Sequence, residues 1–269
     1  AGLIAQGRGN APRVVEPPPD HQRLGIVTGL RLGRAAPVRE LAQMPQRVDP
    51  FYGAPQSIYS DEFNFSNGVD GPVGYKLEVP PLHPGMSSGV IPGHGETQIN
   101  NMAGLPHMQS VIALLRDGFH PESPGGTVSL RDDGSPVLDY PVTDYLWDGL
   151  RKAFHTMAEI QFAAGAERVR LMHLDSDWYT NWTDAKAAID QLPMAPHRVR
   201  LFTAHQMGGC AMGVDPATSV VNGFGEHHHV SNLSVHDASI FPTSIGANPQ
   251  LSVYALAARN STRLAQRLS

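Results

Sequence analysis

The sequence has little cysteine, little charge and no long apolar run. Its single cysteine, Cys210, excludes an intrachain disulfide framework and a thiolate-rich zinc site. Charged residues make up 17% of the chain, and a formal net charge of −5 gives no cationic surface for nucleic acid or an anionic membrane. The longest apolar runs, such as residues 111–115, fall far short of the ~20 residues that span a bilayer. We therefore expect neither a nucleic-acid partner nor an integral membrane segment.

Glycine and proline, by contrast, are abundant, with 27 and 23 residues among 269. Much of the chain must therefore run as turns and ordered loops, which argues against an all-helical bundle. Hydrophobic residues make up 41% of the chain, enough for a globular protein of one or two domains. One free thiol does not fix the redox compartment, so the location stays open, and a soluble cytoplasmic protein is the expectation.

Local patterns predict strands and turns in the first half. Residues 8–24 contain three consecutive prolines and are typical of an extended connector. Residues 73–79 alternate apolar and polar side chains, as a half-buried strand does. Residues 127–130 and 136–140 flank Asp133-Gly134, whose tolerance of positive φ predicts a β-hairpin.

The second half predicts helices separated by strands. A helix should begin with Thr143 or Asp144 as N-cap, carry an apolar stripe and stop near Gly165. A strand at 169–174, a helix at 182–192 ended by Pro193, and a strand at 199–202 should follow. Separated strands and helices of this kind predict an α+β fold.

The last seventy residues concentrate the chemistry. His205 follows the predicted strand at 199–202 and precedes a glycine-rich turn, and a rigid strand end is a good mount for a catalytic base. A short strand within 232–239 leads into small polar residues. Asn248 should be the N-cap of the final helix, with Pro249 at its first position.

Three ordered motifs carry a family resemblance: residues 205–213, residues 233–242, and Asn248-Pro249. Together they resemble the C-terminal signature of the glucose–methanol–choline (GMC) family of FAD-dependent alcohol oxidoreductases. The family's frequent Thr-Cys-Arg-Met is replaced here by Gly209-Cys210-Ala211-Met212, so the arginine is missing. The resemblance is strong over 199–269 and weaker over the preceding part, which is similar to the family's substrate-binding domain.

The resemblance implies oxidation of an alcohol to a carbonyl by hydride transfer to the flavin N5. His205 would be the general base, because an imidazole with a pKa near ~6.5 suits proton removal near neutral pH. Asn248 would hold the substrate oxygen through its side-chain amide. Cys210 is expected to have no catalytic role, because nothing basic beside it would lower its pKa.

The resemblance also implies a cofactor site. Asp237 and Ala238 would lie near the ribityl–phosphate chain of FAD. Asn248, Pro249 and Gln250 would place the start of the final helix at the pyrimidine edge of the flavin, where free N–H groups stabilise negative charge.

The expected organisation follows from these motifs. Residues 1–50 would be an extended connector or part of the flavin domain, 51–195 a substrate-binding domain built on a sheet with helices, and 196–269 the C-terminal part of a Rossmann-like FAD domain. A Gly-x-Gly-x-x-Gly turn, which holds the FAD pyrophosphate, is missing from the sequence. We therefore expect a second polypeptide, or an N-terminal half of the same product, to supply that turn.

Two alternatives come from different classes. Residues 85–89 fit Gly-x-Ser-x-Gly, so Ser87 with His205 could form a serine hydrolase site, although the prolines around the motif do not suit a nucleophile elbow. The chain could also be a non-catalytic subunit that only shapes a substrate pocket. His227, His228 and His229 are adjacent and lack spaced partners, so we expect a loop there and no metal site.

Overall fold

The computed structural model describes residues 3–5, 35–54 and 56–269. The predicted connector at 8–24 lies outside the described residues. Contacts divide the chain into two compact units. Unit 1 comprises the described parts of Ala1–Arg34, Pro124–Pro141 and His205–Ser269, and unit 2 comprises Ala35–Ser123 and Val142–Ala204.

Unit 2 is built on a five-stranded sheet in which every neighbouring pair is antiparallel. The strand order is β3-β4-β5-β2-β8. The strands are β2 (Ala35–Gln43), β3 (Tyr59–Ser60), β4 (Tyr75–Glu78), β5 (Met108–Arg116) and β8 (Arg168–Leu171). The strand predicted at 73–79 is confirmed as β4, and the one predicted at 169–174 as the shorter β8.

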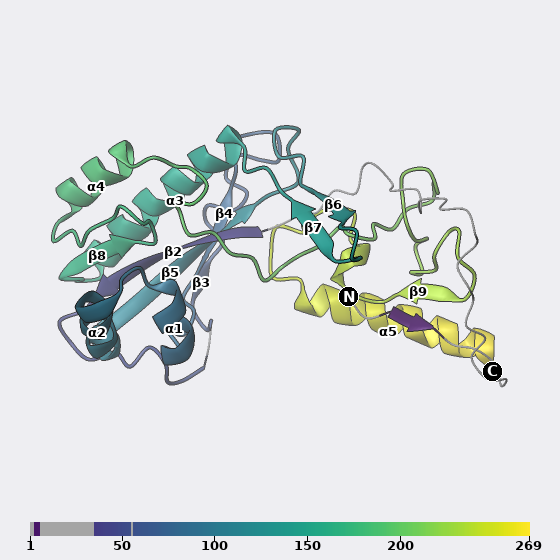
Figure 1. Cartoon of the computed structure of the whole chain (residues 1–269), viewed down its shortest axis with the longest axis horizontal. Coiled ribbons are helices and arrows are strands. Elements are labelled where there is room, and N and C mark those ends of the chain that lie inside the picture. The colour runs from purple at the N-terminus through teal and green to yellow at the C-terminus, as the bar shows by residue number, and fades with distance from the viewer. Residues whose placement is uncertain (1–2, 6–34, 55) are drawn as a thin grey trace. The chain divides into compact units, whose positions relative to one another are not determined.

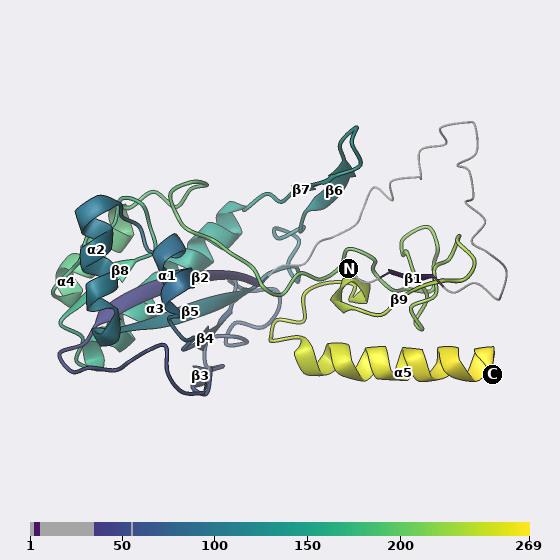
Figure 2. The same ribbon diagram turned by 60° about the horizontal axis from the view of Figure 1, so that its bottom comes forward.

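Helices cover both faces of this sheet (Figures 1 and 2). One face carries α3 (Asp144–Ala163) and α4 (Trp182–Gln191). The other face carries α1 (Pro84–Val90), α2 (Gly95–Gly104) and the 3₁₀ turn η1 (Leu105–His107). The strands therefore present side chains to packed neighbours on two sides, which explains why almost every residue of β5 is buried.

The long helix α3 confirms the periodicity argument. Its predicted stripe is fully buried, namely Leu146, Leu150, Phe154, Met157 and Gln161. The helix ends before Gly165, whose φ of 88° is the left-handed conformation that terminates helices. Thr143 occupies the N-cap position, but its hydroxyl donates to the carbonyl of Glu122 at 2.7 Å and caps no helical N–H.

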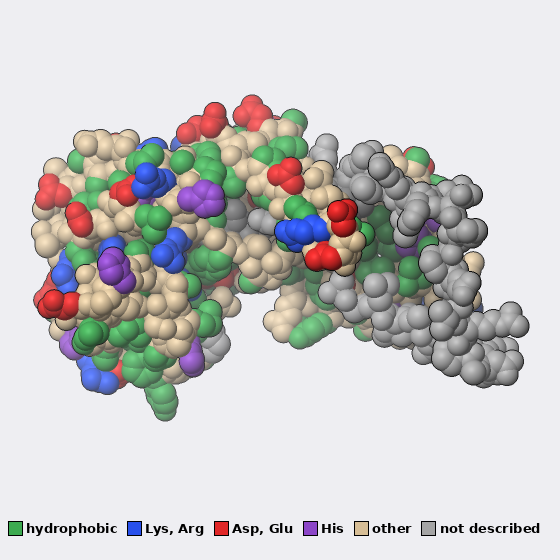
Figure 3. All heavy atoms as spheres, in the orientation of Figure 1, with side chains coloured by type: hydrophobic (Ala, Val, Ile, Leu, Met, Phe, Trp, Pro, Cys, Tyr) green, Lys and Arg blue, Asp and Glu red, His purple; other side chains and the backbone are tan. Residues whose placement is uncertain are grey.

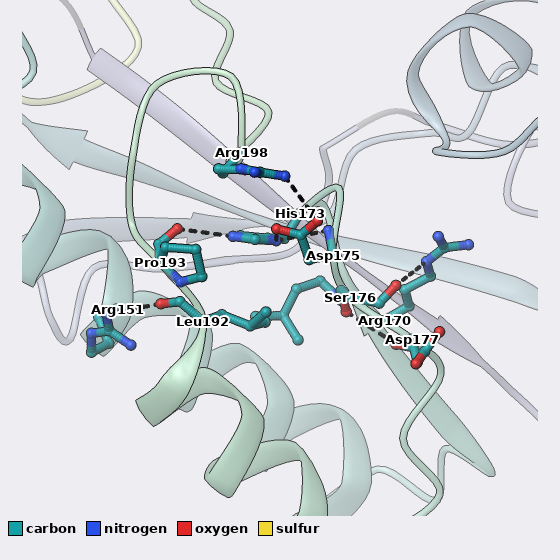
Figure 4. A network of polar contacts seen from close by, with 10 residues as sticks. Arg151, Arg170, His173, Asp175, Ser176, Asp177, Leu192, Pro193 and Arg198 are labelled. Atoms are coloured by element: carbon teal, nitrogen blue, oxygen red, sulfur yellow. Dashed lines mark hydrogen bonds and ion pairs between the residues drawn. The ribbon is translucent and has the colours of Figure 1, made fainter.

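A buried histidine is hydrogen-bonded to the turn that follows α4. The buried His173 bonds through Nε2 to the carbonyl of Pro193 at 2.9 Å, and its Nδ1 accepts from the amide of Asp175 at 3.0 Å. Figure 4 shows this imidazole between the two backbone groups. Polar groups on both sides of the turn are thus satisfied inside unit 2.

Unit 1 contains a hairpin, a two-stranded sheet and one long helix. The predicted hairpin is confirmed as β6 (Thr127–Leu130) and β7 (Pro136–Asp139), with Gly134 at φ 80° in its turn. β1 (Leu3–Ala5) pairs antiparallel with β9 (Leu233–Val235), and the 3₁₀ turn η2 (Ala238–Ile240) and helix α5 (Gln250–Leu268) follow. Sheets with helices packed on them in unit 2, and the mixed elements of unit 1, confirm the α+β class.

A carboxyl group is buried beneath α3. Glu40 of β2 is 0% exposed, and its Oε1 accepts from Nε2 of Gln161 at 2.9 Å. Among the described residues neither Glu40 Oε2 nor Gln161 Oε1 has a hydrogen-bond donor. Burial raises the pKa of Glu40 well above 4.5, because the cost of desolvating the carboxylate outweighs its stabilisation by the hydrogen bond from Gln161.

Gly149→Ala should destabilise unit 2. A Cβ at Gly149 would lie 1.9 Å from Cγ1 of Val73, so α3 would have to move away from the sheet. We expect a loss of ~1–3 kcal/mol in the free energy of unfolding, measured by chemical denaturation of the full chain. Gly89→Ala in α1 is the matched control, because a Cβ there meets nothing within 4 Å. Equal stabilities for the two variants would contradict the close approach of α3.

Glu40→Gln should stabilise the protein at high pH. The raised pKa means that the folded state keeps a proton which the unfolded chain has lost, so wild-type stability falls as pH rises above 4.5 towards the folded-state pKa. The amide removes this loss, and we expect a gain of ~1–3 kcal/mol at pH 8 that shrinks towards pH 4. Denaturation curves across that range measure it, with exposed Glu159→Gln on α3 as control. A difference independent of pH would refute the buried-acid interpretation.

Candidate active site

His205 is the first residue of the last stretch of unit 1, His205–Ser269. Its imidazole is half-buried, and desolvation lowers its pKa from the usual 6.5. The side chain is therefore neutral at pH 7, which is the state that a proton acceptor needs.

The strand predicted at 199–202 is wrong. Val199 forms only an isolated bridge with His173, and no strand is assigned to the rest of that segment in the described chain. After a turn at residues 195–198, in which His197 has a φ of 63°, the chain pairs only briefly with residues 172–174, which directly follow β8. His205 thus lies in an irregular segment and not at the end of a strand.

The glycine-rich turn after His205 is held by backbone hydrogen bonds. The amide of Cys210 donates to the carbonyl of Ser239 at 2.8 Å, and that of Met212 to the carbonyl of Ile240 at 2.8 Å. These two bonds join the segment that follows His205 to the turn that contains Asp237. Burial raises the pKa of the Cys210 thiol, which agrees with the absence of a nucleophilic role.

Asp237 and Ala238 form the start of η2. The Oδ1 of Asp237 accepts from the amide of Ser239 at 2.9 Å and also from its hydroxyl. Both Asp237 and Ala238 are half-buried. The carboxylate therefore organises the turn.

Helix α5 begins one residue later than predicted. Pro249 occupies the N-cap position with φ −84° and ψ −6°, and its carbonyl accepts the first helical bond from Val253 at 2.9 Å. Asn248 is consequently outside the helix, and the N-cap role predicted for it is wrong. Proline has no side-chain acceptor, so the N-cap residue does not cap the N–H groups of the first turn, which begins at Gln250.

The amide of Asn248 is available for an outside partner. The side chain is half-buried and makes no hydrogen bond within the described part of the chain, including to His205. Pro249 behind it is buried. The structure thus puts His205, Asp237, Ala238, Asn248 and Gln250 in unit 1, and the contacts that join them directly run between the His205 segment and the Asp237 turn.

Contacts in the middle of α5 hold the helix. Leu256 packs against the buried cluster of Val221, Val235 and Ile240. Arg263 lies 3.7 Å above the ring of Phe224. The first turns of the helix expose apolar side chains, since Leu251 is 81% and Tyr254 59% exposed.

The hydrolase alternative fails on geometry. Ser87 lies in the middle of α1, 0% exposed, whereas a nucleophile elbow presents the serine at a sharp turn from a strand into a helix. Ser87 Oγ has no hydrogen-bond partner among the described residues, so no base activates it.

The three adjacent histidines occupy an irregular segment, as predicted. His228 Nε2 bonds to the hydroxyl of Ser219 at 3.0 Å, and Nδ1 of His227 accepts from backbone amides at 3.0 Å. Across the described ranges, no three histidine, cysteine or acidic side chains converge as metal ligands. In the same ranges no helix is both long and apolar enough to cross a bilayer.

Two hollows in unit 2 contain none of the predicted site residues. One, of about 340 Å³, lies at the start of α3 and is lined by four carboxylates, Asp70, Glu122, Asp144 and Asp148, together with Lys152. The other, of about 210 Å³, includes Ser110 and Tyr52. On the face that Figure 3 shows, acidic and basic side chains of unit 2 are interspersed.

Comparisons with known proteins agree with the motif order. A long-chain-alcohol oxidase of Arabidopsis thaliana is 31% identical over 189 residues, which is 67% of this chain and 25% of the plant protein. A cholesterol oxidase of Acinetobacter baumannii is 45% identical over 58 residues, or 22% of this chain and 10% of that protein. The chain spans 25–30% of the length of the first curated relatives it matches.

Solved structures show the same fold at low identity. A formate oxidase of Aspergillus oryzae matches with a TM-score of 0.58 and 17% identity, covering 90% of this chain and 48% of that one. The family model described as GMC oxidoreductase matches residues 121–257, just over half of the chain. The chain therefore belongs to the GMC oxidoreductases, a family of FAD-dependent enzymes.

Proposed function

We propose that this chain carries the proton-accepting part of an FAD-dependent enzyme that oxidises an alcohol to a carbonyl. The observation that carries the proposal is the half-buried imidazole of His205, whose lowered pKa keeps it neutral at pH 7. His205 would take the hydroxyl proton of the substrate. The relatives named long-chain-alcohol oxidase and cholesterol oxidase support an alcohol with a large apolar body as the substrate class.

Asn248 would position the substrate. Its half-buried amide has no internal hydrogen-bond partner in the described chain, so both its oxygen and its nitrogen are available. An amide donor that holds the substrate oxygen would fix the carbon that loses the hydride. Pro249 would make this arrangement rigid, since its ring restricts the backbone directly after Asn248.

The donor set at the start of α5 fits a flavin. The first turn of α5, from Gln250, has N–H groups without a side-chain cap, and such groups stabilise an anionic ring edge. Asp237 and Ala238, in the turn that precedes α5 along the chain, would contact the ribityl–phosphate chain. FAD would supply the hydride acceptor, N5. The chain's own residues would bind it, orient the substrate and remove one proton.

The pyrophosphate cradle would come from outside this chain. The sequence has no Gly-x-Gly-x-x-Gly turn, and this turn supplies the backbone amides that bind a dinucleotide pyrophosphate. We propose that an N-terminal segment or a partner polypeptide supplies it. The small part of the relatives' length that this chain spans supports that division.

His205→Ala should slow alcohol oxidation by ~10²–10⁴-fold in the complete FAD-loaded enzyme, because general-base catalysis is worth that much. Stopped-flow reduction of the flavin measures the rate, with exposed His229→Ala as the control in the same unit. Flavin content should not change. The lowered pKa also places the acidic limb of the kcat/KM profile below pH 6.5. A His205→Ala rate within a few-fold of wild type would refute the assignment.

The chain alone should not retain FAD stoichiometrically. A flavin edge held by the start of α5 lacks partners for its pyrophosphate charge, and half a site binds weakly. Absorbance after gel filtration gives the FAD content of the 29.0 kDa chain, alone and mixed with a polypeptide that carries the glycine-rich turn. We expect stoichiometric flavin only in the mixture. One FAD per chain without the second polypeptide would overturn the proposed division.

A further inference from the structure

The sheet face opposite α3 gathers three arginines. Leu41 of β2 lies opposite Arg170 of β8, so the alternation of side chains places Arg39, Leu41, Arg170 and Met172 on one face. The amide of Met172 donates to the carbonyl of Arg39 at 3.1 Å, and the amide of Arg200 donates to the carbonyl of Met172 at 2.9 Å. Arg39 and Arg200 therefore flank Met172 on adjacent chain segments.

Arg200 points to the same side as Arg39. Its neighbours Val199 and Leu201 both pack with the core under α3. Nη1 of Arg200 accordingly reaches the carbonyl of Gly89 in α1, at 3.4 Å. We call Arg39, Arg170 and Arg200 the arginine face.

Arg39 and Arg170 are buried, whereas Arg200 is half-buried. Arg39 is 7% exposed and Arg170 9% exposed. In the part of the chain that the structure describes, no ion pair involves any of the three. Arg170 Nε donates to the carbonyl of Ser176 at 3.1 Å, as Figure 4 shows, whereas the buried Nε of Arg39 has no acceptor among the described residues.

The buried charge of Arg39 has no acidic counterpart among the described residues. Burial lowers the pKa of both Arg39 and Arg170. At Arg170 the negative charge of Asp177 opposes this shift, and the positive charge of Arg200 adds to it. Guanidinium groups stay protonated at neutral pH despite such shifts. Buried arginines are rare without a partner, because desolvating an unpaired charge is costly.

The neighbours of Arg39 on this face include apolar side chains, and the buried Glu78 of β4 lies opposite Ile112 in the same register. The ring of Phe202 lies 5.5 Å from Arg39 Cζ. Ile112 is the β5 residue in register with Arg39, and it packs with Leu114 on this face. A guanidinium fork bordered by an aromatic ring and aliphatic side chains suits a carboxylate attached to an apolar body.

We propose that the arginine face binds the carboxylate of a molecule whose remaining body is apolar. Arg39 would hold the carboxylate oxygens through its two-pronged donor set, with Arg170 and Arg200 adding positive charge. Phe202 would pack against the first carbons of the apolar chain. The site belongs to unit 2 alone, so it stands or falls independently of the catalytic role of His205.

Calorimetric titration of the full chain with decanoate tests the site, with decanol as the uncharged counterpart. We expect one decanoate per chain, bound at least tenfold more tightly than decanol. Arg39→Met should weaken decanoate binding at least tenfold, and Arg39→Lys should fall between, because an ammonium keeps the charge and loses the fork. Arg198→Met is the matched control, since Arg198 is 52% exposed and paired with Asp175 at 3.1 Å.

Circular dichroism establishes that each variant is folded, and Arg170→Met replaces Arg39→Met if the latter is not. The proposal is overturned if decanol binds as tightly as decanoate, if the folded variant keeps wild-type affinity, or if Arg198→Met loses as much. Displacement of decanoate by an equal concentration of inorganic phosphate would also overturn it, since a general anion site needs no apolar body.

Discussion

The antiparallel ladder between β2 and β5 is the interaction on which unit 2 depends. It pairs the two strands over their whole length, from Ala35 opposite Arg116 to Gln43 opposite Met108. A slip of one residue would exchange the two faces of β2 and carry Arg39 into the core under α3. The burial of Glu40 against α3 and the position of the arginine face both follow from this register.

Unit 1 is organised by backbone hydrogen bonds more than by a large core. Its buried apolar cluster consists of Val221, Val235 and Ile240, with α5 packed on it through Leu256. Loops around this cluster are joined by bonds such as those from Cys210 and Met212 to the Asp237 turn. Residues proposed to act in chemistry sit on such loops, where the backbone can approach a ligand and polar groups remain available.

Two kinds of polar burial have different consequences. His205 is partly desolvated, which lowers the pKa of an imidazole and leaves a neutral base. Glu40 is fully desolvated, which raises the pKa of a carboxyl and leaves a neutral acid paired with Gln161. Arginine has no neutral form near pH 7, so the same burial at Arg39 leaves a charge that an external anion can compensate. The chemistry of each side chain thus decides whether burial produces a base, a structural contact or a binding site.

Sequence by itself determined the features that depend on neighbouring residues. The stripe of α3, its stop at Gly165, the hairpin around Gly134 and the ordered motifs of the GMC family are all local patterns. Helix α5 was located correctly, but its cap was misplaced by one residue, because the backbone angles of Pro249 and not its neighbour's side chain set the first helical bond. The prediction of a strand at 199–202 was wrong because its partner β8 ends early. The alternative of a nucleophilic Ser87 was wrong because helix α1 buries this side chain. Only the tertiary structure brought Arg39, Arg170 and Arg200 to one face. Arg39 and Arg170 lie on strands that are distant in sequence, and register between distant strands is decided by packing on both sides of a sheet.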